Sequence, residues 1–425
     1  MTATSYKNGL LQMENVPLQR IAQKHGTPVY CYSTRQLADN FHAYQTALSD
    51  IMPEDKFTIC YACKANSNQA ILHLLGMLGA GADVVSGGEM YRAFKAGVTH
   101  DKMVFSGVGK TADEIVKAVR NDILQINVES EPELNLVSTL AAKESSAKAH
   151  IALRVNPDVD ANTHEKITTG RSGNKFGIDI KAAPALYRRA RDMAGLAPTG
   201  VAVHIGSQLM DLAPFAEAFK RVAELVNELR QQGNIITTVD LGGGLGVPYR
   251  GETPPDIKKY AGLIRDIILP LNVHVILEPG RSIAADAGVL LTRVRYIKES
   301  GDKRFLIVDA GMNDLARPAL YDAYHAIMPC GEPAKGAVMT AYDVVGPVCE
   351  TSDTFRTGAE LPRIDPDALL AIMTAGAYGA SMASNYNTRP LPAEVLVSDE
   401  QFDLIRPAQK IEDIAAADVI PDWLA

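Results

Sequence analysis

The segment Phe57-Thr-Ile-Cys-Tyr-Ala-Cys-Lys-Ala-Asn66 opens a pattern that repeats along the chain. Its first seven residues are rich in β-branched and aromatic side chains, which indicates a strand, and residues 66–79 have a helical pattern. Lys64 therefore lies between the C-terminal end of a strand and the next helix. Lysine forms Schiff bases with carbonyl cofactors, although an ordinary surface lysine is the commoner occupant of such a junction.

The same order of elements recurs after residue 57: a short apolar strand, a polar or glycine-rich turn, and an amphipathic helix. Further strands are predicted at 82–85, 103–106, 123–128, 150–156, 200–205, 236–241 and 273–277. Two helix starts fit the capping box, Thr111-Ala-Asp-Glu114 and Ser130-Glu-Pro-Glu133. An open doubly wound sheet would use the same pattern, but eight units are the number that closes a (β/α)8 barrel. We therefore expect a TIM-like α/β barrel over residues 35–282.

The pattern changes after Arg281. Alternating strand-like runs at 288–298 and 304–308 are joined by Ser300-Gly-Asp-Lys303, a hairpin turn, and similar runs follow at 337–345, 368–374, 394–397 and 402–405. We expect residues 283–425 to form an all-β domain, a β-sandwich or Greek-key barrel. Residues 1–34 contain one more strand, Pro28-Val-Tyr-Cys-Tyr32, which we expect to join that domain. The long polar segment 158–177 fits a mobile flap and a loop without function equally well.

Composition limits the classes of protein that this chain can represent. Its 425 residues exceed one ordinary core, and 47% hydrophobic with 22% charged residues is typical of a globular protein. The net charge of −8 argues against nucleic acid and anionic membranes as partners. The first residues lack a signal-peptide core and no apolar run could span a bilayer, so we expect the cytoplasm. Of the five cysteines, Cys60 and Cys63 are interpreted as packing residues rather than metal ligands.

Chemically distinctive residues follow the predicted strands. Barrel enzymes carry their active residues on the loops after the strands, because these loops meet at the open top of the barrel. The residues found there include Lys64, Asp83, His204, Ser207, Gly242, Gly243, Gly244, Glu278, Gly280 and Arg281. We expect them to line one site.

The types of residue in these loops indicate a particular cofactor. The run Gly242–Gly246 lets backbone N–H groups approach an anion, and it follows strand seven, where barrels commonly bind phosphate. Arg281 supplies a charge for phosphate or carboxylate. Glu278 can keep a pyridine nitrogen protonated, and His204 can stack on a flat ring. Together with a Schiff-base lysine at Lys64, these features describe a site for pyridoxal 5'-phosphate.

At this point the chain resembles a known family, the fold type III pyridoxal-phosphate decarboxylases, from about residue 28 to residue 406. In the barrel the resemblance rests on Tyr61-Ala-Cys-Lys-Ala-Asn66, His204-Ile-Gly-Ser-Gln208, Leu241-Gly-Gly-Gly-Leu-Gly246 and Glu278-Pro-Gly-Arg281. In the β region it rests on Asp309-Ala-Gly-Met-Asn-Asp-Leu-Ala-Arg-Pro318, Gly346-Pro-Val-Cys-Glu350 and Ala375-Gly-Ala-Tyr-Gly379.

The resemblance implies roles for these residues. The cofactor-binding residues implied are Lys64, Asp83, His204, Ser207, Gly242, Gly243, Gly244, Glu278, Gly280, Arg281 and Tyr378, and the substrate-binding residues are Arg281, Arg317, Tyr321, Glu350 and Tyr378. Lys64 would hold the cofactor covalently, and Cys349 would protonate the substrate Cα after CO2 leaves. A buried apolar packing role is the alternative for Cys349. Family members are homodimers whose active site is shared, with the Cys-Glu pair reaching in from the partner subunit.

The substrate follows from the charges that the resemblance brings together. Related decarboxylases of ornithine and arginine prefer an aspartate after the cysteine and carry no arginine for a distal carboxylate, whereas this chain has Glu350 and Arg317. We therefore expect decarboxylation of meso-2,6-diaminopimelate at its D-centre, which yields L-lysine. The alternatives are a decarboxylase of carboxynorspermidine, ornithine or arginine, and a regulatory relative without activity. The last requires a broken site, yet Lys64, Glu278 and Cys349 are all present.

Overall fold

The computed structural model describes residues 3–144, 148–159 and 175–424. The chain divides into two compact units. The barrel unit comprises Ala38–Pro248 and Thr253–Ile283, and the β unit comprises Met1–Leu37, Tyr249–Glu252 and Ala284–Ala425. The short insertion at 249–252 thus belongs to the β unit, although the chain on both sides of it belongs to the barrel unit.

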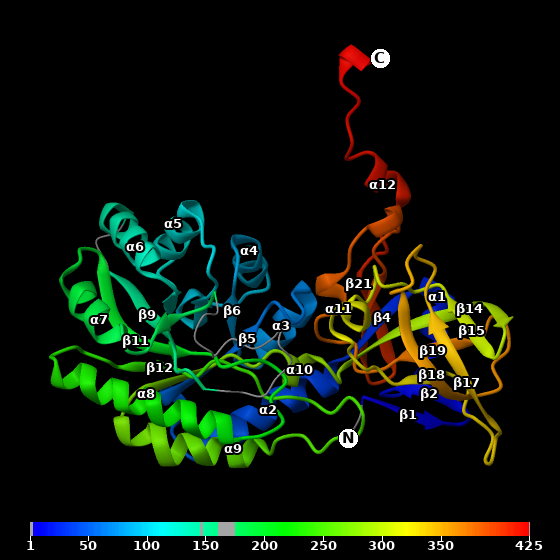
Figure 1. Ribbon diagram of the computed structural model, residues 1–425, viewed down its shortest axis with the longest axis horizontal. Coiled ribbons are helices and arrows are strands. Elements are labelled where there is room, and N and C mark those ends of the chain that lie inside the picture. Colours follow the sequence, from blue (N-terminus) through cyan, green and yellow to red (C-terminus); the bar gives the residue numbers. More distant parts are fainter. Residues whose placement is uncertain (1–2, 145–147, 160–174, 425) are drawn as a thin grey trace. The chain divides into compact units, whose positions relative to one another are not determined.

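The barrel unit is built on a closed parallel sheet (Figure 1). Its strands are β5 (Phe57–Ala62), β6 (Gly81–Val84), β7 (Met103–Phe105), β8 (Gln125–Val128), β9 (Ala149–Asn156), β11 (Leu196–Val203), β12 (Thr238–Asp240) and β13 (His274–Leu277). Neighbours follow the order β9-β11-β12-β13-β5-β6-β7-β8, and β8 pairs with β9 to close the ring. The predicted eight-stranded barrel is confirmed. A short strand, β10 (Ile178–Asp179), also pairs with β9.

Helices follow the barrel strands, as the repeat predicts. They are α3 (Gln69–Met77), α4 (Gly87–Lys95), α5 (Ala112–Arg120), α6 (Glu131–Glu144), α7 (Ala183–Asp192), α8 (Ala213–Gln231) and α9 (Ile257–Leu263), with α2 (Thr34–Ser49) before the first strand and α10 (Arg281–Ala284) after the last. The capping box at Thr111 is present in full. At Ser130 only half of it forms, because the Glu133 side chain accepts from the amide of Glu129 instead.

The next observations concern cysteine burial, metal-binding clusters and membrane-spanning helices, and they refer to the described residues alone. Cys60 and Cys63 are buried in the barrel, as expected of packing residues. Within the described ranges, no cluster of His, Cys, Asp and Glu could hold a metal ion. No helix in the same ranges combines the length and apolar character that a membrane span needs. Of the predicted polar segment 158–177, residues 160–174 lie outside the described residues.

The β unit contains one large sheet and one small one (Figure 1). The large sheet has the order β18-β17-β15-β14-β4-β20-β21, and β19 pairs with both β14 and β16. The strands are β4 (Val29–Ser33), β14 (Gly288–Ser300), β15 (Lys303–Val308), β16 (Ile327–Pro329), β17 (Met339–Val345), β18 (Thr354–Pro362), β19 (Leu369–Ile372), β20 (Ala393–Ser398) and β21 (Gln401–Arg406). The small sheet contains β1 (Thr4–Lys7), β2 (Leu10–Met13) and β3 (Val16–Pro17), followed by α1 (Leu18–His25).

The N-terminal strand β4 lies inside the large sheet. It pairs antiparallel with β14 and parallel with β20, so all its residues are buried. Strands β16 and β18 and the small sheet do not appear among the predicted elements. Strand β16 has only 3 residues, and β18 alternates irregularly between buried and exposed positions. Neither strand therefore shows a clear two-residue period in its sequence.

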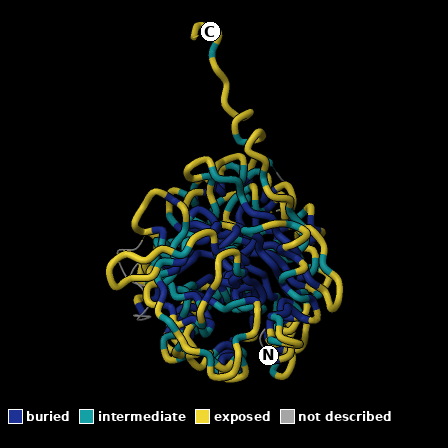
Figure 2. Tube along the Cα trace, turned by 90° about the vertical axis from the view of Figure 1, so that its right-hand side faces the viewer, coloured by how far each residue is buried: buried dark blue, intermediate teal, exposed yellow. Residues whose placement is uncertain are grey.

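Side chains from these strands form a continuous core in the β unit. The buried cluster includes Met13, Val29, Cys31, Val289, Leu291 and Val395, drawn from both termini and the middle of the chain. The last segment differs from this core. From α12 (Ile411–Ala415) to η8 (Asp422–Leu424) the chain is exposed along nearly its whole length (Figure 2).

The barrel core depends on the apolar stripe of α8. Phe219 is 1% exposed and packs edge-on against Tyr260 at 5.8 Å between ring centroids. Phe219→Ala removes this ring and leaves a cavity, so we expect the free energy of unfolding to fall by about 3–5 kcal/mol. Chemical denaturation followed by circular dichroism measures this change. Asn227→Ala, an exposed substitution on the same helix, should change it by less than about 0.5 kcal/mol; equal losses for both variants would contradict the prediction.

Candidate active site

Lys64 lies two residues beyond the end of β5, on the turn that leads toward α3. Its Nζ donates to Asp83 Oδ2 at 2.5 Å, and Asp83 belongs to the neighbouring strand β6. The Asp83 side chain is fully buried, while that of Lys64 is 36% exposed. The parallel pairing of β5 with β6 brings the two side chains together. The amine is therefore fixed at the barrel mouth by a buried carboxylate.

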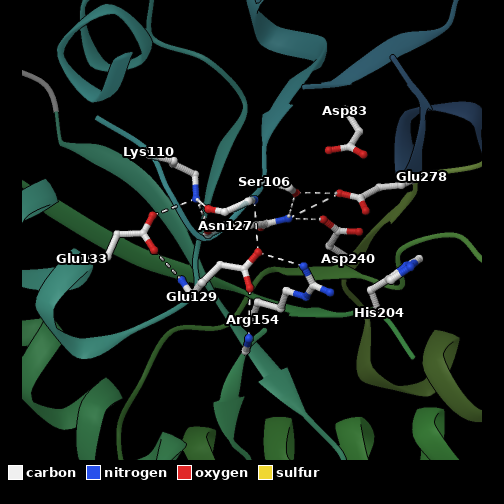
Figure 3. A network of polar contacts seen from close by, with 12 residues as sticks. Asp83, Ser106, Lys110, Asn127, Glu129, Glu133, Arg154, His204, Asp240 and Glu278 are labelled. Carbon is white, nitrogen blue, oxygen red and sulfur yellow. Dashed lines mark hydrogen bonds and ion pairs between the residues drawn. The ribbon is translucent and has the colours of Figure 1, made fainter. Parts of the chain in front are cut away.

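Glu278 follows β13 and enters a buried polar network (Figure 3). Its Oε1 accepts from Ser106 Oγ at 3.3 Å and from Asn127 Nδ2 at 3.4 Å. Burial raises the pKa of Glu278 well above its usual range, and the negative charges of Asp240 and Asp83 raise it further. Glu278 therefore holds a proton more readily than an exposed glutamate. A carboxyl group with a raised pKa can hold a proton for a basic ring nitrogen.

The glycine turn 242–244 packs directly against the end of β13. A Cβ on Gly243 would lie 2.2 Å from the carbonyl oxygen of Glu278, so no side chain fits there. The amide of Gly242 donates to Asp240 Oδ1 at 2.9 Å and that of Gly243 to His204 Nδ1 at 3.3 Å. These two amides therefore already have acceptors within the chain.

His204 lies at the end of β11, half-buried beside that turn. Burial lowers the pKa of His204 well below its usual value, and the positive charges of Arg154 and Lys64 lower it further. The imidazole is therefore neutral, and its Nδ1 accepts rather than donates a hydrogen bond. A neutral ring suits stacking on a flat heterocycle.

Arg281 and Ser207 meet on the same side of the barrel. Arg281 Nη2 donates to Ser207 Oγ at 3.1 Å, and its Nε does so at 3.3 Å. The preceding Gly280 packs against the end of β5, where a Cβ would meet that of Ala62 at 2.9 Å. The segment Glu278-Pro-Gly-Arg281 is therefore tightly packed, which keeps the side chains of Glu278 and Arg281 at the same end of the barrel.

A second layer of buried charges braces the ends of β7, β8 and β9 (Figure 3). Lys110 Nζ donates to Glu133 Oε1 at 2.7 Å and to the Asn127 carbonyl at 2.6 Å. Arg154 Nη1 donates to Glu129 Oε1 at 2.8 Å. These ion pairs join neighbouring loops, and they hold the backbone of Asn127, which contacts Glu278.

The barrel residues fit pyridoxal 5'-phosphate on two observations. Asp83 Oδ1 is buried and has no hydrogen-bond partner among the described residues, although Oδ2 holds Lys64. The glycine turn leaves a surface without side chains next to neutral His204 and the backbone of Glu278 and Pro279. An unsatisfied buried acceptor, a reactive amine and an anion cradle are the groups that this cofactor requires.

Arg317 and Tyr321 lie in the β unit, one turn apart on the short helix α11 (Arg317–Tyr321), so they share a face. Arg317 is buried, and its Nη1 contacts His325 Nε2 at 2.8 Å. His325 Nδ1 faces the carbonyl of Met373 at 2.8 Å and must donate, so Nε2 accepts from Arg317. The guanidinium also stacks over Tyr249 at 4.7 Å. Arg317 is thus oriented on two sides.

Cys349 and Glu350 also belong to the β unit, in the turn between β17 and β18. Cys349 is exposed, whereas the other four cysteines are buried. Glu350 accepts from Tyr386 Oη and from Ser352 Oγ, the latter at 3.0 Å. The hydrogen bond from Tyr386, then that from Ser352, lowers the pKa of Glu350. The thiol is thus not a core residue, and the neighbouring carboxylate is ionised.

Tyr378 has a backbone conformation that is uncommon for a residue with a side chain, with φ at 56°. The turn is held by the amide of Gly376, which donates to the Ala285 carbonyl at 3.0 Å. Residues in this region of φ/ψ space concentrate at functional sites, because the surrounding structure must hold them there. The conformation fits a role for Tyr378 in binding.

Sequence reasoning did not identify several residues that support this site. In the barrel unit these are Ser106, Asn127 and Asp240, and in the β unit Tyr249, His325 and Tyr386. One signal was present for Asp240 and Asn127: each is a polar residue inside a strand that is otherwise buried on both faces. For the β-unit residues no local pattern distinguishes them.

Known proteins are similar to this chain over nearly its whole length. Residues 34–285 match the family described as pyridoxal-dependent decarboxylase, pyridoxal binding domain. Diaminopimelate decarboxylase of Pseudomonas aeruginosa is 47% identical over 421 residues, which cover 98% of this chain and 99% of that protein. The protein of that name from Aquifex aeolicus is 45% identical over 410 residues, 96% of each.

Solved structures agree with these relatives. The crystal structure of diaminopimelate decarboxylase from M. jannaschii in complex with L-lysine has a TM-score of 0.94 at 41% identity, covering 100% of this chain and 99% of that one. The Helicobacter pylori structure, also with L-lysine, has a TM-score of 0.89 at 44% identity, covering 94% and 98%. The resemblance inferred from the motifs is confirmed. The chain belongs to the pyridoxal-dependent decarboxylases and, within them, to the diaminopimelate decarboxylase family.

Proposed function

We propose that this protein, with pyridoxal 5'-phosphate, removes CO2 from the D-centre of meso-2,6-diaminopimelate and releases L-lysine. The observation that carries the cofactor assignment is the Lys64 amine held by buried Asp83 at the barrel mouth. The substrate assignment is supported by full-length similarity to diaminopimelate decarboxylases, including two whose structures hold L-lysine.

Each barrel residue has a task in this reaction. Bound through Lys64, the cofactor supplies an electron sink for the bond that breaks when CO2 leaves. Glu278 would hold a proton at the ring nitrogen, and neutral His204 would stack on the ring. Arg281, Ser207 and the glycine turn would hold the phosphate. The Arg281 guanidinium already donates to the Ser207 hydroxyl, so both side chains lie close enough to bind one anion.

The β-unit residues would recognise the substrate and supply the last proton. Arg317 can pair with a carboxylate in a two-point arrangement, because His325 and Tyr249 fix the plane of its guanidinium. Ionised Glu350 would hold the distal ammonium, with Tyr321 and Tyr378 beside the substrate. The Cys349 thiol would donate a proton to the substrate Cα on one face after CO2 departs.

We also infer that the protein acts as a homodimer in which each site takes Cys349 and Glu350 of the partner subunit. The support is that both side chains are exposed on the single chain, although a proton donor to carbon works best away from bulk water. We place the activity in the cytoplasm, whose reducing conditions suit five free thiols.

Lys64→Ala removes the amine that holds the cofactor. We expect the near-visible absorbance band of the purified protein to disappear and CO2 release from meso-diaminopimelate to fall by at least about 1,000-fold. Absorbance spectra and a radiochemical CO2 assay measure the two effects. Lys258→Ala, an exposed lysine at the start of α9, serves as the control and should change neither. A band that persists in Lys64→Ala would contradict the cofactor assignment.

Substrate selection tests the role of Arg317. At equal concentrations we expect kcat/KM for meso-diaminopimelate to exceed that for ornithine, arginine or carboxynorspermidine by about 1,000-fold or more, because only a matched substrate pairs every buried charge. Arg317→Lys should lower the value for diaminopimelate by about 10- to 100-fold, since lysine loses the two-point geometry. The exposed substitution Arg265→Lys is the control. Preference for ornithine would overturn the assignment.

Mixing two inactive variants tests the shared site. Cys349→Ala, like Lys64→Ala, should lower activity by at least about 100-fold. If sites are shared, one site in each mixed dimer combines an intact Lys64 with an intact Cys349. Random exchange of equal amounts should then restore about 25% of the wild-type activity. Activity that stays at the level of the separate variants would show that each chain completes its own site.

A further inference from the structure

Asp240, the last residue of β12, lies among the predicted cofactor-binding groups, yet the proposed reaction gives it no task. It is 1% exposed, in a barrel strand whose other residues are Thr238 and Val239. A carboxylate in the interior of a barrel is costly unless it has partners, so its contacts indicate what it does.

The first set of contacts links Asp240 to Glu278 (Figure 3). Asn127 Nδ2 bridges the two side chains, at 2.8 Å from Asp240 Oδ2 and 3.4 Å from Glu278 Oε1. The amide of Asn127 therefore holds the two carboxyl groups near each other. Two neighbouring buried carboxyl groups repel each other when both are ionised, which favours one proton on the pair.

The second set of contacts links Asp240 to the glycine turn. Asp240 Oδ1 accepts from the amide of Gly242 at 2.9 Å, and the carbonyl of Gly242 accepts from the amide of Glu278 at 2.7 Å. One oxygen of Asp240 thus orders the turn assigned to phosphate, and the other side of the same carboxylate faces the group assigned to the ring nitrogen.

The charges around the pair decide where its proton lies. Burial raises the pKa of Asp240 to about 6, while the hydrogen bonds from Asn127, Gly242 and Glu278 hold it down. Burial, and then the charges of Asp240 and Asp83, also raise the pKa of Glu278 well above its usual range. The negative charge of Asp240 therefore helps Glu278 to keep a proton. Among the described residues, other titratable groups that interact electrostatically with the pair include Lys64, Cys60 on β5 and Tyr260 on α9.

We propose that Asp240 is a positioning residue of this active site: it accepts the proton carried by Glu278 and anchors the glycine turn, so that the ring-nitrogen acid and the phosphate cradle are set by one side chain. This inference rests on the proposed function, because it assigns Asp240 to the same cofactor. Asp240 would act on the cofactor through Glu278 and Gly242.

Asp240→Asn tests the proposal in the holoenzyme. The substitution keeps an oxygen for the Gly242 amide but removes the negative charge that helps Glu278 to retain its proton. We expect the pH midpoint of the cofactor absorbance change to move down by about one unit, and kcat at pH 7.5 to fall by about 10-fold with KM changed less than about 3-fold. Asp211→Asn is the matched control, since the Oδ1 of exposed Asp211 also accepts from a backbone amide; it should shift neither.

Asn127→Ala provides a second and opposite expectation, which remains testable if Asp240→Asn does not fold. Asn127 also donates to Glu278 Oε1, and losing this hydrogen bond disfavours ionised Glu278, so the absorbance midpoint should move up instead of down. Opposite shifts in the two variants support the proposal. An unchanged midpoint in either folded, cofactor-loaded variant overturns it, because a purely structural role would lower cofactor retention without moving the midpoint.

This test is separate from that of the proposed function. The absorbance midpoint depends on the charges around the cofactor, including that of Glu278, whether or not diaminopimelate is the substrate. If the wild-type holoenzyme shows the spectral shifts but does not decarboxylate diaminopimelate, the substrate assignment fails and the role of Asp240 stands. If diaminopimelate is decarboxylated and the midpoints do not move, the reverse holds.

Discussion

Closure of the parallel sheet by the pairing of β8 with β9 is the constraint on which the barrel site depends. In an open sheet, the residues after β5 and after β13 would lie along an edge or at a switch point. In a closed ring, the C-terminal ends of all eight strands face the same mouth. Lys64, His204 and Glu278 follow strands far apart in the sequence, and the parallel, in-register pairing brings their loops to one end of the barrel.

Closure also brings several carboxylates together in the barrel interior, and hydrogen bonds and ion pairs offset the free-energy cost of burying them. Strand ends crowded with carboxylates would repel one another in an interior of low dielectric constant. Here Asp83 is paired with Lys64, Asp240 accepts from Asn127, and Glu129 is paired with Arg154. Each of these three carboxylates has a partner from another strand or loop. Groups that satisfy one another in this way also set protonation states, which links stability of the barrel mouth to its chemistry.

The β unit positions its candidate residues in a different way. Its large sheet is assembled from segments at both ends of the chain, with β4 between β14 and β20. On this scaffold the candidate substrate residues lie on loops and on the short helix α11, and each is oriented by side chains distant in sequence. Arg317 depends on His325 and Tyr249, and Glu350 depends on Tyr386. None of these supporting contacts obeys a spacing rule, since loop geometry sets them.

The barrel was predictable because the alternation of apolar strand and amphipathic helix is visible in the local sequence. Eight such units in succession are typical of a closed (β/α)8 barrel. The predicted strand bounds lie within two residues of the observed ones except at the start of β11, which begins at Leu196, before the predicted segment 200–205. Strands β16 and β18 were missed, because their burial depends on partners elsewhere in the sheet rather than on a period within the strand.

The sequence by itself determined which reactive groups the chain possesses: a lysine after a strand, a glycine turn, an acid after the last barrel strand and a cysteine in a characteristic motif. Residue type and order along the chain carry that information directly. Only the tertiary structure decided how these groups are protonated and held. Burial lowers the pKa of His204 and raises that of Glu278, and Asp240 accepts from the amide of Gly242 in the glycine turn. These properties depend on distance and dielectric environment, which arise when strands remote in the sequence become neighbours.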